Sequence, residues 1–333
     1  MSLDKSRSTL IDKTYVRARE MLFNVAGYDH PAESLYASLK YVDGQKWTSG
    51  YEAAKQWLAE SHPEFVNEYI CVPRDEITDV YEPRSRWQTL TASEPSVLSA
   101  LHREAIALGT ELGLRLDIPL HDFGITDSLL WGEGHELSDI DLVVFGTRYA
   151  KNIQSRGAEL YEERHGELTR PDPLKMTAPY SLQVTDWASL LARKVHMGSY
   201  RGRFFSLRVV MDATDLSHVP RKTLLAVGEK TTVTFEVADV RQSLCFPAIY
   251  RDAAGNELVD YSVVYEGVFR EGDRVRATCS REQIRYEDGR EVSRFIVDGE
   301  VVLDQSNRES ERLAGTSLSL RESRALRPGE GEV

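Results

Sequence analysis

The chain is poor in cysteine and lacks the common short catalytic motifs. Only three of its 333 residues are cysteines, they lie far apart, and no CxxC pair occurs, which argues against a zinc knuckle or a disulfide framework. There is no GxGxxG, Walker A or HExxH sequence, so nothing indicates a dinucleotide fold, a P-loop or a zinc-protease helix. No repeat of 20–50 residues is visible, which excludes a solenoid.

Long hydrophobic runs are also missing. No apolar stretch approaches the ~18–20 residues of a membrane span, and the first residues, MSLDKSRSTLID, are charged and have no signal-peptide core. Hydrophobic residues make up 41% and charged residues 28% of the chain, as in ordinary globular proteins. We therefore expect a cytoplasmic protein with no membrane contact.

Positive charge is scarce overall but locally concentrated. The chain has 41 Lys and Arg against 53 Asp and Glu, a net charge of −12, which argues against a general nucleic-acid coat because phosphate would be repelled at long range. Residues 190–225 reverse this balance, with seven basic residues against two acids. We expect phosphate-binding side chains here, although a solvated basic face is the alternative. The candidates are Lys194, Arg201, Arg203 and Arg208.

The length suggests two or three domains, and the predicted fold class is α+β. Residues 1–90 are expected to form a small α+β unit with strands at 21–26 and 35–42 and a helix at 51–60. Residues 91–222 would form a core with a mixed sheet and helices. Residues 223–303 are rich in strands and turns, and the tail, 304–333, has a composition typical of disorder.

The β-rich unit is expected to form an OB-like barrel. Turn signals separate its short strands at intervals typical of small barrels. Such barrels often bind oligonucleotides, and exposed aromatic side chains would then stack on RNA bases. Alternatively, the same aromatic residues fill the barrel interior. They are Phe246, Tyr250, Tyr261, Tyr265 and Phe269.

An apolar stripe predicts a long helix before the most informative segment. Leu98, Leu101, Ala105, Leu108 and Leu112 recur at helical spacing. We expect the helix to begin near residue 95, where a proline suits the first turn, and to end near residue 113.

Two acidic residues alternate with apolar ones in the sequence SDIDLVV, residues 138–144. Side chains two apart on a strand point to the same face, so Asp139 and Asp141 would project side by side. Two neighbouring carboxylates repel each other unless a cation lies between them. Such oxygen ligands suit Mg²⁺, which completes its shell with phosphate and water. Upstream, a turn at Ser128 after a predicted strand offers backbone N–H groups to an anion.

This segment resembles the DNA polymerase beta-type nucleotidyltransferase superfamily. The resemblance rests on FGITDSLLWG (residues 123–132), followed by the Asp-x-Asp strand. Over its whole length the chain is also similar to archaeal and bacterial proteins that combine a turn such as GYDHP (residues 27–31) with this core and a β-rich end. The resemblance implies a Mg²⁺- or Mn²⁺-dependent enzyme that uses a nucleoside triphosphate (NTP).

The family's site residues carry over as follows. Ser128 matches the serine that contacts nucleotide phosphates, and Asp139 and Asp141 match the metal-binding pair. The usual glycine before the serine is Asp127 here, which places a carboxylate where a triphosphate would lie and loses the conformational freedom of glycine. For the third carboxylate, expected from a later strand, we choose Asp212; Asp186 and Asp215 are its rivals.

These features support two hypotheses. The first is a nucleotidyltransferase that moves a nucleoside monophosphate (NMP) to a hydroxyl of an unidentified nucleic acid, protein or small molecule, with release of pyrophosphate. The second is a catalytically degenerate nucleotide- or RNA-binding protein, suggested by Asp127. A metal phosphohydrolase is less consistent with the sequence because no histidine-rich ligand set is present.

Overall fold

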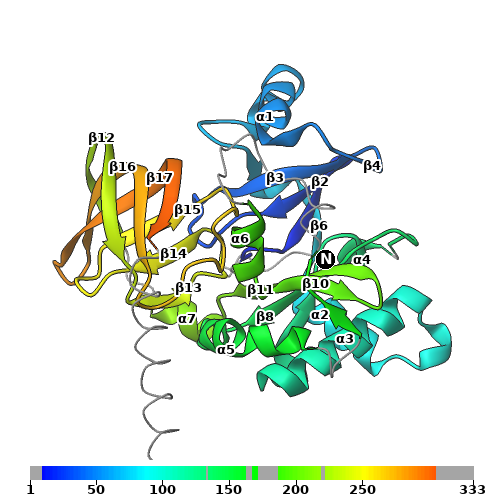
Figure 1. Ribbon diagram of the computed structural model, residues 1–333. Helices are drawn as coiled ribbons and strands as arrows, with labels where there is room; N and C mark the ends of the chain where they lie inside the picture. The colour runs from blue at the N-terminus through cyan, green and yellow to red at the C-terminus, as the bar shows by residue number, and fades with distance from the viewer. Residues whose placement is uncertain (1–9, 133, 163–166, 172–186, 219–221, 305–333) are drawn as a thin grey trace, which may run out of the picture.

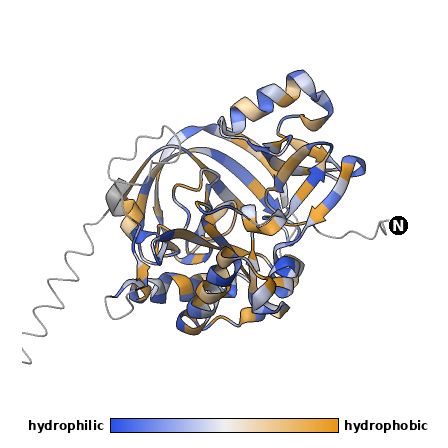
Figure 2. Ribbon diagram, turned by 90° about the vertical axis from the view of Figure 1, so that its right-hand side faces the viewer, coloured by the Kyte–Doolittle hydropathy of each residue, from blue (hydrophilic) through white to orange (hydrophobic). Residues whose placement is uncertain are grey.

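The computed structural model describes residues 10–132, 134–162, 167–171, 187–218 and 222–304. Within these residues the strands form three sheets, and helices accompany the first two, so the α+β class is confirmed (Figure 1). The predicted tail lies outside the described residues apart from Asp304. Hydrophobic and hydrophilic residues alternate along the helices and strands (Figure 2), as expected of elements that bury one face.

The first sheet belongs to the N-terminal unit. Its strand order is β4-β3-β2-β1-β6, and β5 pairs with β3. Alternate residues of β3 are buried against α1, because successive side chains on a strand point to opposite faces. The elements are β1 (Tyr15–Ala18), β2 (Met21–Val25), β3 (Ser34–Val42), β4 (Gln45–Lys46), α1 (Gly50–Ser61), β5 (Cys71–Pro73) and β6 (Ile77–Tyr81). The two predicted strands and the helix are therefore present.

The second sheet forms the core, in the order β7-β8-β11-β10-β9. Strands β8 and β11 are parallel and the other pairs are antiparallel. The strands are β7 (Phe123–Ile125), β8 (Ile140–Phe145), β9 (Leu168–Thr169), β10 (Met197–Tyr200) and β11 (Arg203–Val210). The helices are α2 (Pro83–Ala92), α3 (Ala100–Leu116), α4 (Ser128–Trp131), α5 (Arg148–Arg156), α6 (Trp187–Arg193) and α7 (Ala213–Ser217).

Helix α3 carries the predicted apolar stripe but begins later than expected. Its N-cap is Ser99, whose hydroxyl accepts a hydrogen bond from the backbone N–H of His102 at 3.1 Å. Residues Pro95–Val97 form a separate 3₁₀ turn. A serine cap satisfies an otherwise unpaired N–H of the first turn, so Ser99 begins the helix, and the proline at 95 lies outside it.

The two faces of the core sheet have different neighbours. On one face, Leu142 and Val144 pack in the same cluster as Leu108 of α3 and Ile153 of α5. On the other, Val143 and Phe145 cluster with residues that precede or follow β1 and β2 in the chain. Figure 1 accordingly shows the N-terminal sheet above the core sheet and the helices below it. Asp141, which has the parity of Val143, therefore faces the N-terminal unit.

The third sheet is open rather than barrel-like. Its order is β12-β16-β17-β15-β14-β13, and the two end strands do not pair within the described residues, so no barrel closes. The strands are β12 (Lys222–Glu236), β13 (Asp239–Gln242), β14 (Ala248–Arg251), β15 (Glu257–Asp260), β16 (Arg274–Tyr286) and β17 (Glu291–Asp304). The long strands β12, β16 and β17 pair antiparallel at one side of this sheet.

Most aromatic residues proposed to stack on RNA bases lie inside this unit. Tyr250, Tyr265 and Phe269 are buried in its core, so they stabilise the fold and are not available to a ligand. Tyr261 is exposed and its ring meets that of half-buried Phe246 edge-on at 6.1 Å. None of the helices in the described residues has both the length and the apolar character needed to cross a bilayer.

Candidate active site

The loop between β7 and β8 has the backbone geometry expected of a glycine. At Asp127, φ is 54° and ψ is −137°, a conformation that residues with a Cβ atom rarely adopt. The Tyr15 hydroxyl of β1 donates a hydrogen bond to Asp127 Oδ1 at 2.5 Å. Ser128 begins the short helix α4 directly after this residue. The aspartate therefore keeps the glycine-type turn and is held there by a contact from the N-terminal unit.

The acidic pair lies where the chain enters the central strand β8: Asp139 directly precedes the strand, and Asp141 is its second residue. Asp139 is exposed and Asp141 is half-buried, whereas Ile140 and Leu142 are fully buried and anchor the strand. Burial, and then the negative charges of Asp127 and Asp139, raise the pKa of Asp141 to about 7, against a hydrogen bond from Ser206. Burial also raises the pKa of Asp139. The pair thus carries mutual repulsion that a cation would relieve.

The strand register places Ser206, and not Asp212, beside this pair. Ser206 of β11 is the partner of Asp141 in β8, and its hydroxyl donates to Asp141 Oδ1 at 2.6 Å. Asp212 follows six residues later, ~20 Å further along at the usual strand rise. There it caps α7, exchanges hydrogen bonds with Asp215 and forms an ion pair with Arg148. The structure therefore does not place Asp212 beside Asp141, and the rival Asp215 lies with Asp212 at α7; the rival Asp186 lies outside the described residues.

Three positively charged side chains lower the pKa of Asp127. Burial alone would raise the pKa of this carboxyl, but Lys40 and Lys13, together with the Tyr15 hydrogen bond and Arg208, lower it below its usual value. Arg208 lies on β11 and is also paired with Glu266 at 3.4 Å. Lys13 and Lys40 belong to the N-terminal unit, more than 80 residues earlier in the chain. Sequence reasoning missed them because no local pattern links them to the loop.

The other basic residues expected to bind phosphate have protein partners. Lys194 Nζ donates to the backbone oxygens of Val263 at 2.9 Å and Glu266 at 3.3 Å, which ties the C-terminal unit to the core. Arg201 forms an exposed ion pair with Glu167 at 2.9 Å. These two side chains are structural in this arrangement.

Arg203 is occupied in a different way, next to the acidic pair. It pairs with Glu104 at 2.9 Å and donates to the backbone oxygens of Glu136 at 2.8 Å and Ser138 at 2.7 Å. It therefore positions the segment that leads into Asp139. Of the four predicted basic residues, only Arg208 lowers the pKa of both Asp127 and Asp141 through its charge.

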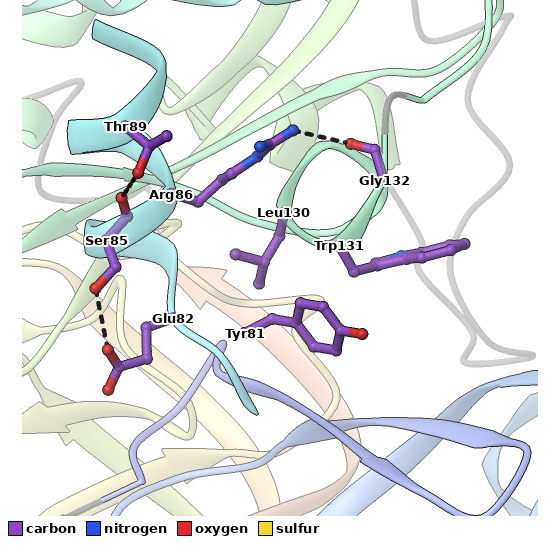
Figure 3. Close-up of a pocket in the computed structure, with 8 residues that line it drawn as sticks. All are labelled: Tyr81, Glu82, Ser85, Arg86, Thr89, Leu130, Trp131 and Gly132. Carbon is purple, nitrogen blue, oxygen red and sulfur yellow. Dashed lines mark hydrogen bonds between the residues drawn. The ribbon is translucent and has the colours of Figure 1, made fainter. Parts of the chain in front are cut away.

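A pocket of about 370 Å³ lies beside α4 (Figure 3). Arg86 of α2 projects along it and donates to the backbone oxygens of Leu129 at 3.3 Å and Gly132 at 3.5 Å. These bonds hold the last turn of the loop against α2. The remaining lining residues are Tyr81, Glu82, Ser85, Thr89, Leu130 and Trp131.

Asp139 and Asp141 are the two carboxylates that the sequence predicts to bind a metal ion. No set of three or more His, Cys, Asp or Glu side chains within the part of the chain that the structure describes is arranged to hold a metal ion. Mg²⁺ is nevertheless commonly bound through one or two carboxylates, with substrate phosphate and water as the other ligands. The donor set of Asp139 and Asp141 fits that pattern.

Comparison with family models, with curated proteins and with solved structures finds no match to this chain. Its function must therefore be inferred from the geometry of the site.

Proposed function

We propose that this chain is a Mg²⁺-dependent nucleotidyltransferase that moves an NMP from an NTP to a hydroxyl acceptor. The observation that carries the proposal is the position of Asp139 and Asp141. Asp139 directly precedes the central strand β8 and Asp141 lies in it, beside a loop with glycine-type geometry at Asp127, where Ser128 opens the following helical turn. Positive charge from Lys40 and Arg208 surrounds the same loop.

Asp139 and Asp141 would hold the metal ion, Mg²⁺ or Mn²⁺. When bound, the ion would offset negative charge on the phosphates and on the leaving pyrophosphate. The Ser206 hydroxyl donates a hydrogen bond to one oxygen of Asp141, at 2.6 Å, and the other oxygen would bind the ion. Because Asp139 is exposed, an ion could reach its carboxylate from solvent.

The remaining residues would bind and orient the nucleotide. Ser128 and the adjacent backbone N–H groups would contact its phosphates, and Arg208 would balance their charge. In the reaction, the acceptor oxygen forms a bond to the α-phosphorus while the bond to the bridging oxygen breaks. Pyrophosphate leaves with that oxygen, and the acceptor loses its proton to solvent.

The test is pyrophosphate release from each NTP with Mg²⁺, across panels of RNA, protein and small-molecule acceptors. Asp139→Asn and Asp141→Asn should each lower the rate on the order of 100-fold or more, since charge stabilisation dominates such reactions. The matched control is Asp75→Asn, an exposed aspartate of the N-terminal unit, which should retain full activity. Turnover that survives the double substitution of Asp139 and Asp141 would refute the proposal.

The Asp127 carboxylate favours a second candidate, a nucleotide-binding protein without turnover. It lies at the loop where phosphates would bind and is held by Tyr15. Calorimetry separates the candidates: this version predicts nucleotide binding in the absence of pyrophosphate release. Asp127→Gly would remove the carboxylate and should then confer activity.

A further inference from the structure

Lys40 occupies an irregular position in the N-terminal sheet. Leu22 of β2 pairs with Tyr41 and the next residue, Phe23, pairs with Leu39, so Lys40 is the extra residue of a β-bulge. Bulges redirect side chains and recur next to active sites. Here the bulge follows Leu39, which is buried in the core of the N-terminal unit.

The residues at the bulge turn towards the candidate site. The ring of Tyr41 meets that of Trp131 edge-on at 4.6 Å, which docks this part of β3 on the loop of the core. The positive charge of Lys40 is attracted to the carboxylates of Asp127 and Asp141. Among the charged groups, Lys40 lowers the pKa of Asp127 the most. The bulge therefore delivers a positive charge from one unit to the acidic centre of another.

Lys40 also lacks a fixed partner. Its side chain is half-buried, and its ammonium group forms no hydrogen bond and no close ion pair with the residues that the structure describes. Lys194, Arg201 and Arg203 differ in this respect, because each is bound to a carboxylate or to backbone oxygens. The Lys40 ammonium is attracted to Asp127 without a close ion pair, so it can form a charge-assisted hydrogen bond to a ligand phosphate.

We propose that Lys40 binds the phosphate chain of the nucleotide at the Asp127–Ser128 loop, so that the N-terminal unit completes the site. Lys13 adds a second positive charge from the same unit, and its backbone oxygen accepts a hydrogen bond from Thr126 at 3.3 Å. The inference rests on the proposed function for the identity of the ligand. The phosphate contact can be tested separately, because it does not depend on base or acceptor.

The experiment measures binding of inorganic tripolyphosphate by calorimetry to the full chain, at two salt concentrations. Lys40→Met should weaken binding on the order of 10- to 100-fold, the usual effect of losing a charge-assisted hydrogen bond, and should reduce the salt dependence. Lys40→Arg should retain binding within a few-fold and shows that the fold tolerates change at this position. Lys55→Met removes the same charge from α1, which Figure 1 shows at the far end of the unit, and should bind as the wild type does.

The outcomes separate this inference from the proposed function. Equal tripolyphosphate affinity of the wild type and Lys40→Met, or no binding to the wild type, would overturn the role of Lys40. Binding that depends on Lys40 without pyrophosphate release from any NTP would support the phosphate site and count against the transferase.

Discussion

Replacing Asp127 by glycine or by alanine isolates the backbone strain at the loop. Both variants lose the carboxylate, its hydrogen bond from Tyr15 and its attraction to Lys40. They differ in the Cβ atom, which alanine keeps and glycine lacks. Because φ is 54° and ψ is −137° at this position, the difference in stability between the two variants reports how much the structure is strained by a side chain there.

The expected difference follows from two opposing effects. A non-glycine residue in such a region costs about 1–3 kcal/mol. Glycine in turn loses about 0.4–1 kcal/mol relative to alanine, because its unfolded chain has more conformational freedom. We therefore expect Asp127→Gly to be more stable than Asp127→Ala by about 1–2 kcal/mol.

Urea unfolding at pH 7.5 measures this difference directly, provided that the two variants have equal m-values. Asp127→Asn serves as the control, since it keeps the acceptor for Tyr15 and the Cβ atom but removes the charge. If the alanine variant were as stable as the glycine variant, or more stable, the backbone at this loop would be unstrained. The explanation of Asp127 as a substituted glycine would then be wrong.

Two further predictions concern the core. A Cβ atom at Gly109 of α3 would lie 2.5 Å from the Trp87 ring, so Gly109→Ala should destabilise by about 1–3 kcal/mol in urea unfolding. The exposed Leu114→Ala should change stability by less than about 0.5 kcal/mol, and a neutral Gly109→Ala would contradict the packing. Burial, together with Lys194, holds the pKa of His196 well below its usual value, so the unfolded chain binds a proton that the folded chain does not. The free energy of unfolding should therefore decrease as pH falls below about 6.5, by up to about 1.4 kcal/mol per pH unit from His196. His196→Gln should remove that part of the pH dependence. An unchanged pH dependence in this variant would refute the prediction.

Much of the candidate site could be predicted from local patterns. The alternation of Asp139 and Asp141 with apolar residues is a property of consecutive residues, and it predicted the strand in which Ile140 and Leu142 are buried, although Asp139 itself precedes β8. The same holds for the stripe of α3, whose spacing predicts the buried face. The position of its first residue needed the cap at Ser99, which competes with a plausible proline start nearby.

The tertiary structure alone decided which distant residues join that pair. The register between β8 and β11 joins segments 65 residues apart, and a shift along the strands changes the partner without changing the local pattern. It selected Ser206 and left Asp212 to cap a helix. Lys40 reaches the loop through a bulge that depends on how β2 and β3 pair, and the inward orientation of Tyr250 depends on which face of an open sheet is covered. Such contacts depend on the packing of the whole chain, so they cannot be predicted from a local sequence pattern.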